Sequence, residues 1–357
     1  MYSALARGMP APKSIPTDFY EILKYIWWNL DKNLDLEMIR ASALATAMDC
    51  AKNGVTFVFD HHASPFAVKG SLETIAKAFD EIGVGHLLCY ELSDRDGEES
   101  KNNGLDETEN YLQNIQGLVG LHASFTVSNE LLIAAADLAT KYDSGIHIHV
   151  AEDPVDQDYC FREHGTRVID RLNNYGVLDY EKTILAHCIH LDKNERSILE
   201  NSKAWIAVNT ESNLNNQVGL FTANGIPEVR IMLGTDGMHS DMIRSAQWHF
   251  FTHKKHEQLT IPQAYQRLRR VHYYLAANKF SGDGDNNLVI FNYDSPTPVT
   301  PENWLGHFFY GLNSSHVHSV ISNGRLIVEN RKLLTADENE ILQFSREQAI
   351  CLWRKLK

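Results

Sequence analysis

Short apolar runs rich in β-branched residues alternate along this chain with longer segments whose apolar positions recur at helical spacing. This alternation is typical of repeated βα units that build a parallel sheet. We predict seven strands, at Thr56–Phe59, Gly85–Tyr90, Leu118–Phe125, Gly145–Val150, Thr183–His187, Ala204–Val208 and Val229–Leu233. The predicted helices lie at Thr17–Leu30, Leu36–Lys52, Leu72–Ile82, Asn129–Tyr142, Tyr159–Tyr175, Asn194–Asn201, Met238–Lys255 and Pro262–Lys279.

The number and order of these elements indicate an α/β fold class. Eight parallel strands, each followed by a helix, close a (β/α)8 TIM-type barrel, and only seven are predicted here. Because helices alone precede the first predicted strand, we expect a barrel that lacks its first strand, with the chain beginning just after it.

The C-terminal part of the chain has a different pattern. Leu288–Tyr293 and Ser319–Leu334 are predicted as strands, and Asn323-Gly324 within the second is a strong signal for a two-residue hairpin turn. We therefore expect three parts, which are the barrel over 1–284, a small β domain over 285–335 and a closing helix over 336–357.

Composition excludes several classes of protein. Hydrophobic residues make up 43% and charged residues 22%, close to ordinary globular usage, which excludes a disordered or collagen-like chain. Thirty-three Lys and Arg against 46 Asp and Glu give a net charge of −13, whose field repels nucleic acid and anionic membranes. The five cysteines are scattered without a C-x-x-C pair, and neither a secretory leader nor a membrane-spanning apolar run occurs. We therefore expect a cytoplasmic protein with neither nucleic-acid nor membrane partners.

The chain has 17 histidines, and several lie at the ends of predicted strands. Between Ile146 and Val150, a period-two strand places His147 and His149 on one face, which in a barrel is the interior. Glu152 follows just beyond the C-terminal end of this strand, where barrel active sites are built. The alternative is a pair of buried histidines whose only role is to form hydrogen bonds within the barrel. The adjoining carboxylate favours a catalytic or metal-binding role instead.

Two further strand ends carry residues of the same kind. His187 ends the next strand, and Asp236 follows the last strand in the motif Gly-Thr-Asp-Gly. The carboxyl ends of parallel strands meet at one rim, so these side chains can converge with His149. Asp236 alone is also compatible with a turn residue or a helix cap, because glycine flanks its motif.

Together these residues predict a polar pocket with the chemistry of a metal site. His61, His62 and His122 lie at further strand ends. Imidazole and carboxylate ligands without a thiolate suit Zn²⁺, or less often Fe²⁺ or Mn²⁺. Such a cation activates water near neutral pH, and a nearby carboxylate can move the protons, so hydrolysis is the predicted chemistry.

Three motifs make the pattern specific. His149-Val-Ala-Glu152, Leu185-Ala-His187-Cys and Gly234-Thr-Asp236-Gly, in this order, resemble the metal-dependent amidohydrolase superfamily. Within it, the chain is similar to the aminohydrolases related to guanine deaminase, S-adenosylhomocysteine deaminase and triazine chlorohydrolase, and most similar to a branch associated with selenium metabolism. The segments that resemble this branch are Asp60–Pro65, Tyr90–Gly97, Glu211–Asn216 and Gly237–Met242.

The resemblance implies a role for each matching residue. His149 and Asp236 would be metal ligands, and Asp236 would also accept a proton from the attacking water. Glu152 would carry protons to the ring nitrogen and to the leaving group, and His187 would polarise or orient the water. The implied reaction is the deamination of a small molecule, an amino-substituted nitrogen heterocycle.

Four further residues are predicted to bind this substrate: His122, His62, Arg95 and Asn213. The resemblance places His122 facing the substrate, and Arg95 lies where it can reach the rim after the third barrel strand of the family. A homodimer is expected from the family alone.

One departure from the family pattern affects the whole interpretation. Relatives carry a His-x-His pair at the end of the first barrel strand, preceded by the N-terminal half of a small β-sandwich domain, and this sequence contains neither. We therefore expect 285–335 to be the C-terminal half of that domain. One Zn²⁺ per chain, or Fe²⁺ or Mn²⁺ instead, is expected if other residues replace the missing ligands.

Three hypotheses are open at this point. The leading one is a hydrolase of carbon–nitrogen bonds other than peptide bonds. The second is a truncated, non-catalytic relative that binds a ligand or partner without turnover. The third is an unrelated barrel enzyme that uses His122, His149 and Asp236 without metal, and full activity after chelator treatment would support it.

Overall fold

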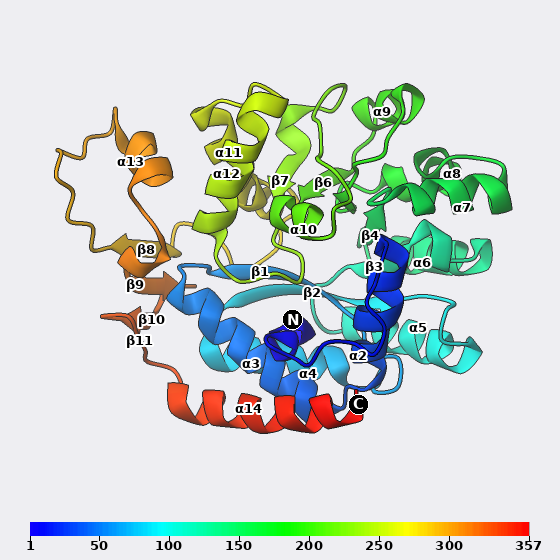
Figure 1. The fold of residues 1–357 in the computed structure, drawn as a ribbon, viewed down its shortest axis with the longest axis horizontal. Coiled ribbons are helices and arrows are strands. Elements are labelled where there is room, and N and C mark those ends of the chain that lie inside the picture. The colour runs from blue at the N-terminus through cyan, green and yellow to red at the C-terminus, as the bar shows by residue number, and fades with distance from the viewer. Residues whose placement is uncertain (357) are drawn as a thin grey trace.

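The computed structural model describes residues 1–356, and its framework is a seven-stranded parallel sheet (Figure 1). The strands are β1 Phe57–His62, β2 Gly85–Leu92, β3 Val119–Ala123, β4 Ile146–Val150, β5 Ile184–His187, β6 Trp205–Val208 and β7 Ile231–Leu233. They pair strictly in chain order, so each βα unit adds one strand to the same curled sheet. The seven predicted strands are confirmed, with shifts of a few residues at their ends.

Helices surround this sheet (Figure 1). They are α3 Leu36–Lys52, α4 Ser71–Ile82, α5 Glu98–Leu112, α6 Asn129–Lys141, α7 Pro154–His164, α8 Val168–Asn174, α9 Lys193–Glu200, α10 Thr210–Asn215, α11 Met242–His256 and α12 Ile261–Ala277. Short helical segments precede them, namely η1 Tyr2–Ala6, α1 Phe19–Ile22, η2 Leu23–Trp27 and α2 Trp28–Lys32. The single helix predicted over 159–175 is two helices, because Gly165 adopts a left-handed φ of 67° at the end of α7.

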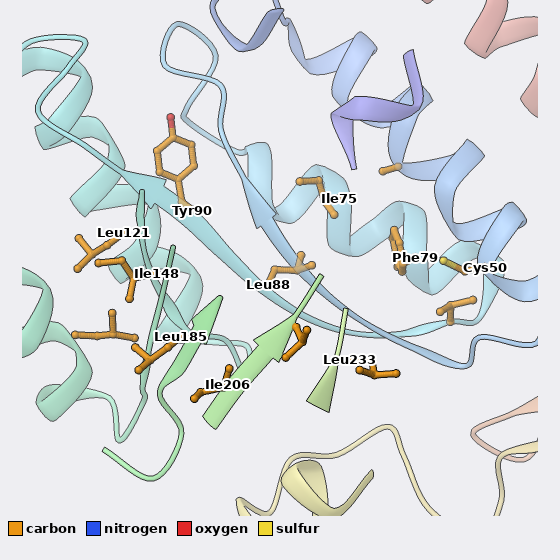
Figure 2. Close-up of a cluster of buried hydrophobic side chains, with 14 of the residues drawn as sticks. Cys50, Ile75, Phe79, Leu88, Tyr90, Leu121, Ile148, Leu185, Ile206 and Leu233 are labelled. Atoms are coloured by element: carbon orange, nitrogen blue, oxygen red, sulfur yellow. The ribbon is translucent and has the colours of Figure 1, made fainter. Parts of the chain in front are cut away.

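Successive strand residues face opposite sides of the sheet, so each strand contributes to two apolar clusters. Leu88 and Leu185 on the outer face belong to a large cluster that also holds Phe79 of α4 (Figure 2). Leu87 and Ile184, each one residue earlier, belong to a second cluster on the inner face. The interior of the curled sheet is therefore packed with side chains, which leaves its polar groups to the strand ends.

A second sheet follows the barrel-like part. Its strands are β8 Leu288–Phe291, β9 Val317–Ser322, β10 Arg325–Glu329 and β11 Lys332–Leu333, and they pair antiparallel in the order β11-β10-β9-β8. Asn323 and Gly324 have φ values of 48° and 78°, the left-handed values that a tight hairpin needs, so the predicted turn is confirmed. Helix α13, Trp304–Tyr310, is an addition to the predicted pattern. The domain boundaries after 284 and 335 stay predictions.

The closing helix α14, Glu338–Lys355, lies along α3 (Figure 1). Ser345 Oγ donates a hydrogen bond to the carbonyl of Ala41 at 3.1 Å, and Trp353 Nε1 donates to the carbonyl of Leu5 at 2.8 Å. Leu352 of α14 is fully buried. The last helix is thus part of the layer that covers the start of the sheet.

Within residues 1–356, β1 and β7 each pair on one side only, so the curled sheet has two open edges. The η1 segment lies near both, because the Met1 amino group contacts Asp60 Oδ1 at 2.8 Å and Ser3 lies beside Gly237. That a first barrel strand is missing stays a prediction. No helix in the described part of the chain is both long and apolar enough to cross a bilayer.

Candidate active site

The carboxyl ends of the strands open into a pocket of about 330 Å³. Its polar lining includes His61, Glu91, His122, His149, Glu152 and Asp236. Several aromatic side chains, among them Phe19, Trp27 and Phe125, line the same pocket. A pocket of this size with aromatic walls and a few converging polar groups suits a small-molecule ligand.

Glu152 and Asp236 line this pocket and meet the fully buried His187 at its wall. One potential ligand atom of each lies within 4.8 Å of the others. Glu152 Oε2 lies 3.4 Å from His187 Nε2, and Glu152 Oε1 accepts a hydrogen bond from Asn216 Nδ2 at 3.3 Å. The three residues follow β4, end β5 and follow β7, so the parallel order of the strands brings them to one rim.

The imidazoles of His149 and His187 are each held in place through Nδ1, and Nε2 of His187 also has Asn209 Nδ2 at 3.5 Å. His149 Nδ1 lies 2.7 Å from the carbonyl oxygen of His122, and His187 Nδ1 lies 2.7 Å from Oδ1 of Asn213. Both oxygens only accept, so each Nδ1 carries the hydrogen and each Nε2 keeps its lone pair. Metal-binding histidines typically have their second nitrogen fixed in this way.

The backbone at two of these positions is unusual. His187 and Asp236 have φ values of 72° and 52°, in the left-handed region that residues other than glycine rarely adopt. Ser212 of α10 donates from Oγ to Asp236 Oδ2 at 2.6 Å and so fixes that carboxylate. Strained backbone of this kind persists where surrounding contacts determine it, and it gathers at functional sites.

The surroundings also set the charge of the two central groups. Burial raises the pKa of Glu152 to about 7, and the neighbouring His187 offsets only part of this effect. Burial, together with the charges of His61 and His187, lowers the pKa of His149 to about 4. At neutral pH, His149 is therefore uncharged, and Glu152 is available both as an acid and as a base.

His122 of β3 forms one wall of the pocket. Its Nδ1 lies 2.6 Å from Thr126 Oγ1, and its ring centre lies 5.6 Å from that of His149. Its carbonyl also holds His149 in place. The structure therefore places His122 where a substrate contact is possible.

His62 and Asn213 lie behind the pocket wall. His62 follows His61 directly on β1, and neighbouring strand residues face opposite sides, so its ring points away from the pocket and contacts Ser64 Oγ at 2.9 Å. Asn213 is 1% exposed and touches His187 rather than the open space. This geometry favours positioning over substrate contact for both residues.

Arg95 is also engaged elsewhere. Its guanidinium donates to Asp31 Oδ2 at 2.6 Å, to Glu91 Oε1 at 2.9 Å and to Asp96 Oδ2 at 2.9 Å. With three carboxylates around it, this side chain has little capacity left for a substrate. Its position favours a role in holding Glu91.

Two residues at the pocket are additions to the predicted set of ligands. Glu91 Oε2 lies 3.3 Å from His61 Nδ1, and the His61 ring centre lies 4.8 Å from that of His149. The signal for Glu91 is its place on β2, two residues after Cys89 of the inner cluster, because a period of two puts both on the inner face. Ser212 and Asn216 are uncharged and follow β6, and no comparable sequence pattern marks them as residues of this site.

Known proteins match this chain over most of its length. The model of the Amidohydrolase family matches residues 13–268. A 5′-deoxyadenosine deaminase of Methanopyrus kandleri is 29% identical over 343 residues, which cover 90% of this chain and 78% of the relative. A 5-methylthioadenosine/S-adenosylhomocysteine deaminase of Syntrophomonas wolfei is 26% identical over 350 residues, again 90% of this chain and 78% of the relative. The crystal structure of an adenosine deaminase from Xanthomonas campestris with bound zinc has a TM-score of 0.84 at 16% identity, covering 98% of this chain and 83% of that one.

Proposed function

This chain belongs to the amidohydrolase family and is an enzyme that hydrolyses carbon–nitrogen bonds, and we propose that it deaminates a nitrogen heterocycle related to adenosine. The convergence of Glu152, His187 and Asp236 within 4.8 Å carries this proposal. This convergence brings together a proton carrier (Glu152), a polarising imidazole (His187) and a carboxylate (Asp236). The matches do not support the non-catalytic alternative, because the relatives carry the names of deaminases.

A divalent metal ion fits the residues around His149. Nε2 of His149 and the carboxylate of Asp236 offer nitrogen and oxygen donors, which suit Zn²⁺, Fe²⁺ or Mn²⁺. The ring of His187, whose Nε2 lies in one group with Glu152 and Asp236, stacks on that of His149 with 5.6 Å between the ring centres. We propose zinc, with His149 and Asp236 as ligands, and the adenosine deaminase from Xanthomonas campestris supports this choice because it holds zinc. When bound, such a cation makes water a nucleophile near neutral pH.

The protein side chains would then move the protons. The water oxygen attacks the carbon that bears the amino group, and Asp236 accepts a proton from this water. His187 Nε2 orients the water for the attack. Glu152 protonates the adjacent ring nitrogen, and a second proton transfer lets the amino group leave as ammonia. In the balance, the water oxygen joins the carbon, one of its hydrogens ends on the ring nitrogen and the other leaves with ammonia.

The pocket walls support a planar ring as the reacting group. Phe19, Trp27 and Phe125 line the same space as Glu152 and Asp236, and aromatic side chains stack favourably on flat heterocycles. The names of the relatives, 5′-deoxyadenosine deaminase and 5-methylthioadenosine/S-adenosylhomocysteine deaminase, point to adenosine-type nucleosides within this class.

An ammonia-release assay tests the proposal. Zinc-loaded protein is incubated with 5′-deoxyadenosine, 5′-methylthioadenosine, S-adenosylhomocysteine and adenosine, and ammonia is measured together with the change in ring absorbance. We expect release from at least one of them, lost on chelation and restored by zinc. No release from the whole panel would contradict an adenosine-type substrate, and undiminished release without metal would support the metal-free alternative.

A further inference from the structure

A second group of potential metal ligands lies next to His149, on the side formed by β1 and β2. One ligand atom each of His61, Glu91 and His149 lies within 4.8 Å of the others. The side chains of His61 and Glu91 are 10% and 6% exposed, so bulk water does little to satisfy them. Neither residue has a role in the proton movements proposed above.

The contacts of His61 show which of its nitrogens is free. Its Nε2 lies 3.1 Å from the carbonyl oxygen of Leu121 and 3.2 Å from that of His147. Carbonyl oxygens only accept, so Nε2 must carry a hydrogen. The other nitrogen, Nδ1, faces Glu91 Oε2 at 3.3 Å, and an ionised carboxylate also only accepts. In neutral His61, two lone pairs would therefore face one another, and a positive centre is needed between them.

His149 directs a third lone pair to the same place. Its Nδ1 donates to the carbonyl of His122, so Nε2 is the nitrogen available to the group. Two imidazole nitrogens and one carboxylate oxygen, supplied by β4, β1 and β2, thus share one small space. This is the donor chemistry of a divalent cation rather than that of a lone proton.

The position of Glu91 is fixed from behind. Its Oε1 accepts from Arg95 Nη1 at 2.9 Å, and Arg95 is in turn held by Asp31 at 2.6 Å. Glu91 therefore keeps Oε2 directed at His61 without rearrangement. Preorganisation of a ligand by a second residue is what metal sites require.

We propose that His61 and Glu91 are ligands of the divalent cation that His149 holds. His149 has a single free nitrogen and can bind one ion, so this ion is the same one for which Asp236 is proposed above as a ligand. The inference rests on the proposed function, because it completes the ligand set of the same cation. Two carboxylates, Glu91 and Asp236, would then balance the charge of a divalent ion bound by neutral imidazoles.

Cobalt(II) is a suitable probe, because its visible absorption reports the ligands directly. The purified full chain is stripped of metal and titrated with Co²⁺, and stoichiometry is measured by plasma mass spectrometry. His61→Gln keeps an amide donor near the Nε2 position for the two carbonyls and removes Nδ1. We expect it to weaken Co²⁺ binding about tenfold or more and to change the absorption spectrum. Glu91→Gln should also weaken Co²⁺ binding and change the absorption spectrum.

A matched control is His147→Gln, which makes the same change to the neighbouring half-buried imidazole. The His147 ring centre lies 4.9 Å from that of His61, and its Nδ1 lies 3.8 Å from Cys89 Sγ rather than facing a carboxylate. This variant should bind Co²⁺ with the affinity and spectrum of the unaltered protein. Circular dichroism shows whether each variant is folded. His61→Cys gives a positive readout as well, because a thiolate at this position would add a thiolate-to-cobalt charge-transfer band.

The outcomes separate this inference from the proposed function. If His61→Gln binds Co²⁺ as the unaltered protein does, or if His61→Cys lacks the charge-transfer band while binding the ion, His61 is not a ligand and the inference is overturned. The site of His149 and Asp236 would still stand in that case. If the unaltered protein binds no divalent ion at all, the metal mechanism of the proposed function fails with it.

Discussion

Arg95 Nη2 donates to Asp31 Oδ2 at 2.6 Å, and this ion pair joins the loop after β2 to helix α2. Both side chains are largely buried, with exposures of 9% for Arg95 and 1% for Asp31. The same guanidinium holds Glu91, which faces His61 in the pocket. One side chain thus connects the N-terminal helices to the polar centre of the barrel.

Replacing Arg95 by alanine should destabilise the fold strongly. The change leaves the carboxylates of Asp31 and Glu91 buried without their cation, which costs about 3–5 kcal/mol in comparable buried pairs. Urea unfolding measures the loss. Arg7→Ala is the control, because Arg7 pairs with Asp49 at an exposed site and should cost less than about 1 kcal/mol. Equal losses in the two variants would show that the Arg95 network is not a stabilising element.

Glu152→Gln should remove turnover while leaving the metal bound. The amide keeps the shape of the side chain but cannot transfer the proton, and loss of a general acid or base lowers rates by about 10²–10⁴-fold. Ammonia release gives the rate, and metal content is measured on the same sample. Glu163→Gln, on the exposed side of α7, is the control and should keep full turnover. Undiminished turnover in Glu152→Gln would remove this residue from the mechanism.

Asp236→Ala should lose metal and turnover together, because the substitution deletes a proposed ligand. Ser212→Ala, which removes only the hydrogen bond at 2.6 Å to this carboxylate, should lower metal affinity by about 10–100-fold. Equilibrium dialysis with zinc ranks the two variants. An Asp236→Ala protein that retains its metal would show that the ligand is assigned to the wrong residue.

The sequence predicts the strands of this fold more completely than its helices. Central parallel strands are buried on both faces, so their apolar runs are visible without knowledge of their neighbours. Helix α5 is mostly polar and is fixed by tertiary contacts, since Glu107 accepts from the backbone nitrogens of Gly70 at 2.8 Å and Leu72 at 3.0 Å. Such a helix depends on residues far away in the sequence, and no local pattern indicates it.

The candidate site shows the same division. Glu152, His187 and Asp236 could be placed together from strand ends alone, because parallel strands end at one rim. The ion pair of Arg95 could not be predicted, because its partner Asp31 lies on a helix whose position in space no local pattern gives. Glu91 is polar on a strand whose neighbours are apolar, and its pairing with a histidine follows only from the packing of β1 against β2.

The stability of the protein should fall in mild acid because of His253. This ring is fully buried in α11, and its Nδ1 donates to the carbonyl of His249 at 3.0 Å. Burial lowers the pKa of His253 from 6.5 to about 4, so the unfolded chain binds a proton in this range that the folded chain does not. The contribution of neutral His253 to the free energy of unfolding is fully present above pH 6.5. It is lost as the pH falls towards 4, and the loss amounts to up to about 3 kcal/mol.

His253→Asn tests this pH dependence, because it keeps a donor for the His249 carbonyl and removes the titration. Urea unfolding at several pH values should show a shallower loss of stability in acid than in the unaltered protein. Glu257, Arg267, His249 and His256 also face this ring and are unchanged in the variant, so the difference isolates His253. The exposed His256 is the control, and His256→Asn should keep the original slope. Identical slopes for His253→Asn and the unaltered protein would contradict the prediction.

The packing of α14 on α3 has a consequence for synthesis in the cell. The hydrogen bond from Ser345 to Ala41 joins residues 304 positions apart. At about 5–20 residues per second, a ribosome needs roughly 15–60 s to add the intervening chain. During that interval α4 and η1 can already pack on α3, but the side of α3 that contacts α14 has no permanent cover. On that side the nascent protein depends on chaperones or on transient local contacts until its last helix emerges.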